Sequence, residues 1–173
     1  RSSTTMGHQP KSVTFVLTEE CNLRCSYCYL MHKNKFHTME LSVAKRAIDY
    51  LLQHRTQFAE PSVVWDFIGG EPFLKVELMG QILEYALLRS YELDHPWFSN
   101  FQISVTTNGT LYHLPAVQQL IKRYREHLHV TISVDGPAHV HDTTRKTKAG
   151  KPSYASVVAN VPLWLEQFPN AST

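Results

Sequence analysis

Two kinds of apolar pattern alternate along this chain. Runs rich in β-branched and aromatic residues predict strands, and runs whose apolar residues recur every three or four positions predict helices. Each predicted strand is followed by a segment with helical spacing, which gives a repeated strand–helix pattern. The predicted strands cover residues 12–18, 62–68, 100–107 and 129–135.

The predicted helices differ in how clearly the sequence marks their ends. Ser42 has the residue type of an N-cap and predicts the start of the first helix. Pro162 lies within the fourth and predicts a break or a late start there, because proline lacks a backbone N–H. The second, third and fourth helices are expected over residues 76–90, 115–128 and 154–168. The first helix is expected to bury Val43, Ala47, Ile48, Leu51 and Leu52.

Four strand–helix units in succession predict an α/β fold with a parallel sheet and helices packed on it. A complete eight-unit barrel needs about 250 residues, whereas this chain has 173. We therefore expect a partial (β/α) barrel of about four units, formed by residues 12–173. Residues 1–11 are expected to be a disordered tail or an expression-vector remnant. In such folds ligands lie at the carboxyl ends of the strands.

Composition narrows the class of protein. Hydrophobic residues make up 43% of the chain, which excludes a disordered composition. The formal net charge of +2 gives no basic patch for nucleic acid. No apolar run approaches the roughly 18–20 residues that span a bilayer, and the polar N-terminus has no signal-peptide core. The three clustered cysteines do not form a disulfide framework, so we expect the protein to reside in a reducing cytoplasm.

The cysteines form the pattern C-x3-C-x2-C, with Cys21, Cys25 and Cys28 directly after the first predicted strand. Three thiolates hold three irons of a [4Fe–4S] cluster and leave the fourth iron open to an external ligand. Zinc is the alternative, because His32 would complete a Cys3His site. On these residues alone, both metal sites remain open.

Three further segments follow the other predicted strands in order: GGEP at 69–72, TNGT at 107–110, and SVDGP at 133–137 followed by His141, Asp142 and Arg145. Tyr27 places an aromatic residue just before the third cysteine. Together with the cysteines, these segments resemble the radical S-adenosylmethionine (radical SAM) superfamily over roughly residues 12–160. The segment that starts at residue 133 is most similar to sulfatase-maturing enzymes and ribosomal-peptide maturases with a SPASM or Twitch domain.

The resemblance implies a [4Fe–4S] cluster on Cys21, Cys25 and Cys28, with S-adenosylmethionine (SAM) on its open iron. An external electron donor of the flavodoxin or ferredoxin type would drive reductive SAM cleavage and hydrogen abstraction from a peptide or protein side chain. A small-molecule or nucleoside substrate is the alternative. No catalytic acid or base is nominated. The resemblance assigns SAM binding to Tyr27, Gly69, Gly70, Glu71, Asn108, Ser133, Asp135 and Arg145.

Individual roles follow from side-chain chemistry within the resemblance. The Gly69-Gly70 carbonyls and Glu71 are acceptors for the amino group of SAM. Arg145 is the bidentate partner for its carboxylate. The structural alternatives are an ordinary turn closed by Pro72 and a solvated loop arginine. For Asn108 the structural alternative is a common Asn-Gly turn.

The chain departs from the maturase pattern in two ways. Every cysteine belongs to the one motif, so the chain carries no auxiliary cluster. The fifth and sixth strands of the core are also missing. We therefore expect a truncated N-terminal half of a longer maturase, with the sheet edge exposed after the fourth strand. A naturally short family member is the alternative.

Overall fold

The structure is a computed structural model that describes residues 9–19, 23–25, 37–133, 145–147 and 154–170. Its centre is a four-stranded, wholly parallel sheet. This confirms the predicted α/β class with an open parallel sheet. The strand order is β1 (Lys11–Val16), β3 (Val63–Ile68), β4 (Phe101–Thr107) and β5 (Leu128–Ile132).

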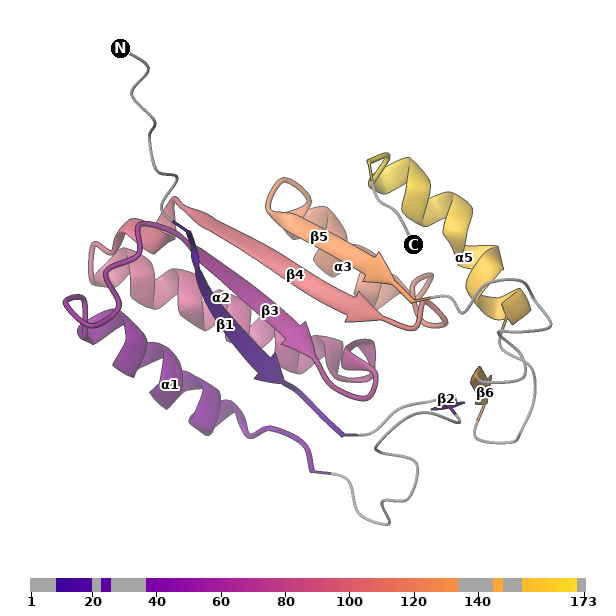
Figure 1. Ribbon diagram of the computed structural model, residues 1–173, viewed down its shortest axis with the longest axis horizontal. Coiled ribbons are helices and arrows are strands. Elements are labelled where there is room, and N and C mark those ends of the chain that lie inside the picture. Colours follow the sequence, from indigo (N-terminus) through magenta and orange to yellow (C-terminus); the bar gives the residue numbers. More distant parts are fainter. Residues whose placement is uncertain (1–8, 20–22, 26–36, 134–144, 148–153, 171–173) are drawn as a thin grey trace.

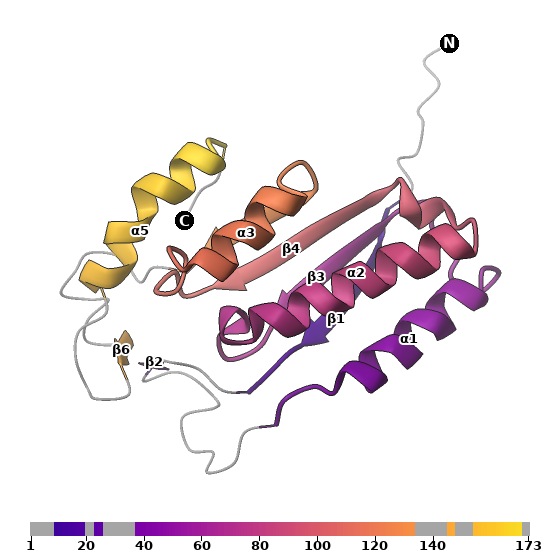
Figure 2. The same cartoon turned by 180° about the vertical axis from the view of Figure 1, so that it is seen from behind.

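The helices cover one face of the sheet. Figure 1 shows the strands in front of the helices, and Figure 2 shows the helices in front of the strands. The helices on this face are α1 (Leu41–Gln53), α2 (Val76–Glu92) and α3 (Pro115–Tyr124). The last helix, α5 (Tyr154–Gln167), packs near β5, where the Trp164 indole N–H donates to the Val130 carbonyl at 2.9 Å. No helix in these ranges is long and apolar enough to cross a membrane.

The core forms between the sheet and these helices. Along β3 and β4, burial alternates residue by residue, as expected when one face of a strand is covered. Trp65 and Phe67 are fully buried on the covered face, where they pack near Phe15. The apolar positions expected to point inward from α3 are all buried: Val117, Leu120, Ile121 and Tyr124.

The first helix starts earlier than the sequence predicts. Its N-cap is Glu40 and not Ser42, and no side chain caps it. The buried stripe is Ala44, Ile48 and Leu52, a spacing of four residues. The predicted inward positions Val43 and Ala47 are exposed, so that part of the prediction is wrong. The error is one of helical phase, since both residues lie beside the buried stripe.

Two other helix ends also differ from prediction. Helix α3 ends at Tyr124 and not at residue 128, because the chain turns there, with His127 N–H donating to the Tyr124 carbonyl at 2.9 Å. Helix α5 runs unbroken through Pro162, so the predicted break or late start is wrong. Buried Val157 and Asn160 before the proline, and Trp164 after it, hold the helix on both sides.

A second, two-stranded sheet was not predicted. Strand β2 (Leu23–Cys25) pairs antiparallel with β6 (Arg145–Thr147). In this register Cys25 is the partner of Arg145. The ladder therefore joins the cysteine segment to a part of the chain about 120 positions away in sequence.

Candidate functional site

The described parts of the predicted motifs lie at the carboxyl edge of the sheet. In Figure 1 the arrowheads of the four parallel strands point toward the side on which β2 and β6 lie. This is the edge at which parallel α/β folds bind ligands. Cys21, Tyr27, Cys28 and Asp135 lie outside the described residues, and Cys25 and Arg145 are placed by their backbone.

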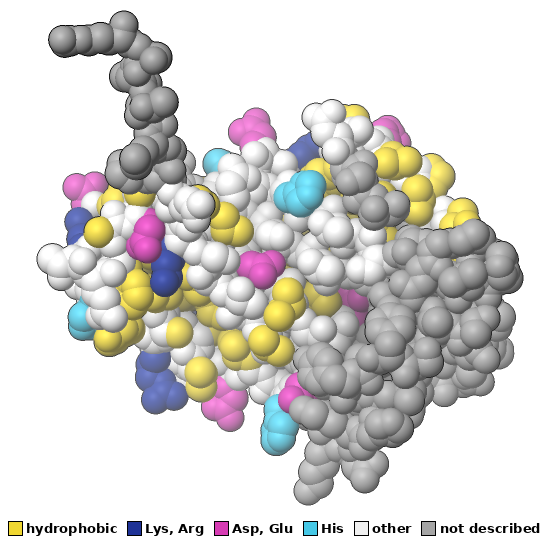
Figure 3. All heavy atoms as spheres, viewed as in Figure 1, with side chains coloured by type: hydrophobic (Ala, Val, Ile, Leu, Met, Phe, Trp, Pro, Cys, Tyr) yellow, Lys and Arg dark blue, Asp and Glu magenta, His cyan; other side chains and the backbone are white. Residues whose placement is uncertain are grey.

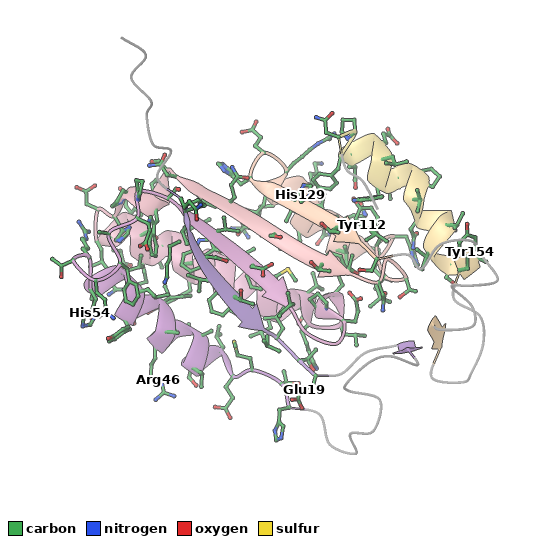
Figure 4. The ribbon with its side chains drawn as sticks, viewed as in Figure 1. Glu19, Arg46, His54, Tyr112, His129 and Tyr154 are labelled. Carbon is green, nitrogen blue, oxygen red and sulfur yellow. The ribbon has the colours of Figure 1, made fainter. Side chains whose placement is uncertain are left out.

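The cysteine segment departs from and returns to one point beside the end of β1. Met39 N–H donates to the Leu17 carbonyl at 2.8 Å, and Glu19 N–H donates to the His37 carbonyl at 3.0 Å. Thr18 and Thr38 form a bridge between these bonds, and Thr18 is fully buried. This clasp, residues 17–19 against 37–39, fixes both ends of the segment at the carboxyl edge (Figure 4, near Glu19).

The Gly69-Gly70 turn packs directly on the clasp. Gly69 has φ +154°, and a Cβ there would lie 2.4 Å from the Thr18 carbonyl oxygen. Gly70 N–H donates to that same oxygen at 2.8 Å. Glycine is therefore required by a close approach of two backbone segments. This close approach packs the turn against the base of the cysteine segment.

Glu71 ties the turn after β3 to the end of β4. Its carboxylate is fully buried and accepts hydrogen bonds from the Thr107 hydroxyl at 2.6 Å and from Asn108 N–H at 2.8 Å. It also accepts from Phe73 N–H at 3.1 Å, which caps the short 3-10 helix η1 (Pro72–Lys75). The side chain therefore braces the turns after β3 and β4 against each other.

The turn after β4 is shaped by Asn108. Its side-chain oxygen accepts from the Thr110 backbone N–H at 3.1 Å and from the Thr110 hydroxyl at 2.7 Å. Gly109 follows with φ +81°, and a Cβ there would lie 2.7 Å from the Ile132 side chain. The turn predicted as the structural alternative is thus present, and it is held close to the end of β5.

Asn160 is a site residue that the sequence reasoning missed. It is buried in α5, and its amide donates to the Gly109 carbonyl at 2.8 Å and more weakly to the Thr110 carbonyl at 3.4 Å. It thereby holds the turn after β4 against the helix. The signal available in the sequence was a single amide inside the apolar run of residues 157–164.

Tyr112 gives the same turn a further anchor (Figure 4). It is fully buried, its hydroxyl donates to the Gln167 side chain, and burial raises its pKa above the ordinary value. Gln167 in turn donates to Gln118 at 2.7 Å. Helices α3 and α5 are therefore linked through the segment that follows the site, and Tyr112 stays neutral there.

The last two described site residues are placed by backbone pairing. Ser133 is half-buried just after β5, where its N–H donates to the Thr107 carbonyl at 3.0 Å. Arg145 pairs with Cys25 in the β2–β6 ladder, so a predicted SAM ligand lies next to a predicted cluster ligand. Within the described ranges, no three His, Cys, Asp or Glu side chains gather as a metal site elsewhere.

Comparisons with known proteins agree with this arrangement. A serine-type anaerobic sulfatase-maturating enzyme of Bacteroides thetaiotaomicron is 30% identical over 83% of this chain and 33% of its own length. A nucleotide dehydratase dependent on S-adenosylmethionine, from Siniperca chuatsi, is 25% identical over 92% of this chain and 40% of its own length. The chain therefore spans well under half of each relative.

A solved structure shows the same fold. Native anSMEcpe with bound AdoMet and Kp18Cys peptide superposes with a TM-score of 0.75 over 92% of this chain and 41% of its own, at 24% identity. The family model of the radical SAM superfamily matches residues 15–173, a range that holds the cysteine segment and the three further sequence segments at 69–72, 107–110 and 133–137. By its motifs, its fold and this match, the chain belongs to the radical SAM superfamily.

Proposed function

We propose that this chain, with residues 12–173 as its core, is all or the N-terminal part of a radical SAM enzyme that acts on a peptide or protein side chain. One observation carries the proposal: the C-x3-C-x2-C segment has both ends clasped at the carboxyl edge of a parallel sheet. That edge is where such folds hold their ligands.

Cys21, Cys25 and Cys28 would hold a [4Fe–4S] cluster and leave one iron open. When bound and reduced by an external donor of the flavodoxin or ferredoxin type, the cluster would supply the one electron for reductive cleavage of SAM. The 5′-deoxyadenosyl radical released by that cleavage would abstract a hydrogen atom from the substrate. This chain's own residues would position the reactants. We place the protein in the reducing cytoplasm, where the thiols stay free to bind iron.

The Gly69-Gly70 turn and Arg145 would orient the methionine part of SAM. The carbonyls of the Gly69-Gly70 turn would accept from its amino group. The Glu71 carboxylate, already bonded to Thr107 and Asn108, would keep that turn in place. Arg145 would bind the SAM carboxylate in a bidentate way. The pairing of Arg145 with Cys25 supports this assignment, because it sets the guanidinium-bearing residue beside the cluster segment.

The adenosine part would contact the neighbouring turns. We assign Ser133 to a hydrogen bond with ribose or carboxylate oxygens and Asp135 to the ribose hydroxyls. Asn108 would hydrogen-bond to the cofactor, and Tyr27 would contact the adenine. Support for Ser133 comes from its position, half-buried just after β5 and bonded to Thr107, the last residue of β4. The peptide substrate is supported by the maturase relative. A nucleoside or other small molecule is the second candidate, supported by the nucleotide dehydratase.

Metal analysis tests the proposal first. After anaerobic preparation and reconstitution, we expect about four irons and four acid-labile sulfides per chain, lost in Cys25→Ala. SAM cleavage with dithionite as the electron source follows on the same preparation.

The zinc alternative makes the opposite forecast. About one zinc and no sulfide, with zinc lost in His32→Ala, would point to a structural Cys3His site and overturn the proposal. Iron retained in His32→Ala agrees with the cluster.

A further inference from the structure

The two faces of the parallel sheet differ in chemistry. The helix-covered face is buried and apolar. A parallel sheet covered on both faces has nearly continuous apolar strands, and a closed barrel is filled by branched apolar side chains. Here the opposite face is mostly polar, with Val16, Val64 and Ile68 as its apolar members, and all its residues in the described strands are half-buried or exposed, so it is not a dry core. Its polar residues in the described strands are Ser12, Thr14, Asp66, Gln102, Ser104, Thr106, His129 and Thr131.

Four of these residues form one row across the strands. The sheet register pairs Thr14 with Asp66, Asp66 with Ser104, and Ser104 with His129. The Thr14 hydroxyl donates to the Asp66 carboxylate at 3.2 Å. Neighbouring strands lie about 4.8 Å apart, so the row is a continuous polar band. His129, labelled in Figure 4, is its exposed end on β5.

Asp66 gives the band its charge. On this face of the four described strands it is the one Asp, Glu, Lys or Arg residue, and Figure 3 views the molecule from this side. Its neighbours on the same side of β3 are Val64 and Ile68, both half-buried. A carboxylate between apolar side chains is complementary to a long basic side chain, because lysine and arginine bury their methylene groups and present a charged end.

We infer that this row is part of the peptide-binding surface and that Asp66 pairs with a lysine or arginine side chain of the substrate. The inference rests on the proposed function and adds a substrate class to it: a peptide with a basic residue. The hydroxyls of Thr14 and Ser104 and the imidazole of His129 supply hydrogen bonds to peptide groups on either side of the basic residue.

Peptide selection tests the inference without needing turnover. The reconstituted protein is used to select from a library of synthetic ten-residue peptides randomised at every position, and bound peptides are sequenced. We expect lysine and arginine to be enriched about fivefold, the effect of one partly screened ion pair. Asp66→Asn should abolish the enrichment, and Asp66→Lys should replace it by enrichment of aspartate and glutamate. Glu126→Gln, which removes an exposed carboxylate at the amino end of β5, should leave it unchanged.

Basic enrichment that survives in Asp66→Asn, or no basic enrichment by the wild-type protein, would overturn the inference. Circular dichroism confirms that each variant is folded, and Asp66→Asn and Asp66→Lys are independent reports of the same charge. Iron, sulfide and SAM binding are measured on the same preparations. A wild-type protein that binds no iron, sulfide or SAM would count against the proposed function, while the peptide enrichment would still decide the role of Asp66.

Discussion

The two ends of the parallel sheet bury polar side chains in different ways. At the carboxyl end, Glu71 and Asn160 hydrogen-bond to the turns that follow β3 and β4. At the amino end, the 3-10 helix η2 (Pro96–Phe98) precedes β4, and His95 accepts from Trp97 N–H at 3.1 Å. The other ring nitrogen of His95 is buried without a hydrogen-bond partner.

The difference separates holding a site from closing a core. Trp97 is fully buried and packs edge to face with Trp65, so these two rings close the core between the sheet and α2 at the amino end. The hydrogen bonds at the carboxyl end hold the backbone turns in fixed positions and leave that edge of the sheet available to a ligand. In parallel α/β folds the carboxyl edge carries function and the amino edge carries stability. Changes at the carboxyl end should therefore alter SAM binding as well as folding.

The largest effect is expected for Gly69→Ala. The new Cβ would lie 2.4 Å from the Thr18 carbonyl oxygen, so either the turn or the clasp must move. We expect a loss of about 4 kcal/mol in the free energy of unfolding and a loss of bound iron. Urea denaturation and iron analysis measure the two.

Gly80→Ala is the matched control for Gly69→Ala. Gly80 lies inside α2, and its Cβ would meet only a Leu120 methyl at 3.8 Å, an ordinary contact. This variant should gain about 0.5–1 kcal/mol. Equal effects in the two variants would show that the close approach to Thr18 is not what requires glycine.

Glu71→Gln comes next. An amide keeps one acceptor but turns an NH2 group toward either Asn108 N–H or the Thr107 hydroxyl. We expect a loss of about 2–3 kcal/mol in the free energy of unfolding and weaker SAM binding by calorimetry. Exposed Glu166→Gln should change neither. Unchanged SAM affinity in a destabilised Glu71→Gln protein would assign the residue to folding alone.

A smaller effect is expected for Asn160→Ala, which removes the donor to the Gly109 carbonyl. The free energy of unfolding should fall by about 1–2 kcal/mol, with a loss of SAM affinity measured by calorimetry. Val158→Ala, at an exposed position of the same helix, should stay within about 0.5 kcal/mol. If SAM affinity is the same in both variants, Asn160 does not position the turn.

The amino end gives the smallest and purely structural effect, a dependence on pH. Burial, and secondarily the charge of Arg55, lower the pKa of His95 below its ordinary value. Protonation would also set an N–H against Trp97 N–H. Because the unfolded chain then binds the proton more readily, the free energy of unfolding falls as pH drops below about 6.5.

The slope from His95 is at most about 1.4 kcal/mol per pH unit, the effect of one proton. Denaturation midpoints between pH 7.5 and 5 in wild type, His95→Gln and exposed His113→Gln measure it. We expect His95→Gln to flatten the profile and His113→Gln to leave it unchanged. A fall in stability with rising pH would contradict the assignment.

The sequence was most informative where a local pattern decides the structure. Runs rich in β-branched and aromatic residues predicted every strand of the parallel sheet, and helical spacing of apolar residues predicted the helix after each. Helix α1 was assigned the wrong phase because Val43 and Ala47 are apolar yet lie beside the buried stripe. Pro162 was overestimated because tertiary contacts on both sides of it outweigh the lost hydrogen bond.

Long-range placement could not be predicted. The β2–β6 ladder joins two three-residue strands far apart in sequence, and no local pattern marks so short a pairing. The motifs indicated which residues gather at the carboxyl edge but not how their side chains turn. Glu71 faces the end of β4, and Asn160 reaches the same turn from a helix with no recognised motif.

The clasp at residues 17–19 and 37–39 has a consequence for how such proteins diversify. A segment whose ends are fixed to one another can change length at little thermodynamic cost, since doubling a closed loop costs only about 0.6 kcal/mol. Leu17 and Thr18 join the clasp to the end of β3 and the turn after it, and Met39 joins the other half of the clasp to Leu17. Natural variation in the number of residues between the two halves of the clasp is therefore expected to leave the clasp, and the scaffold that carries it, unchanged.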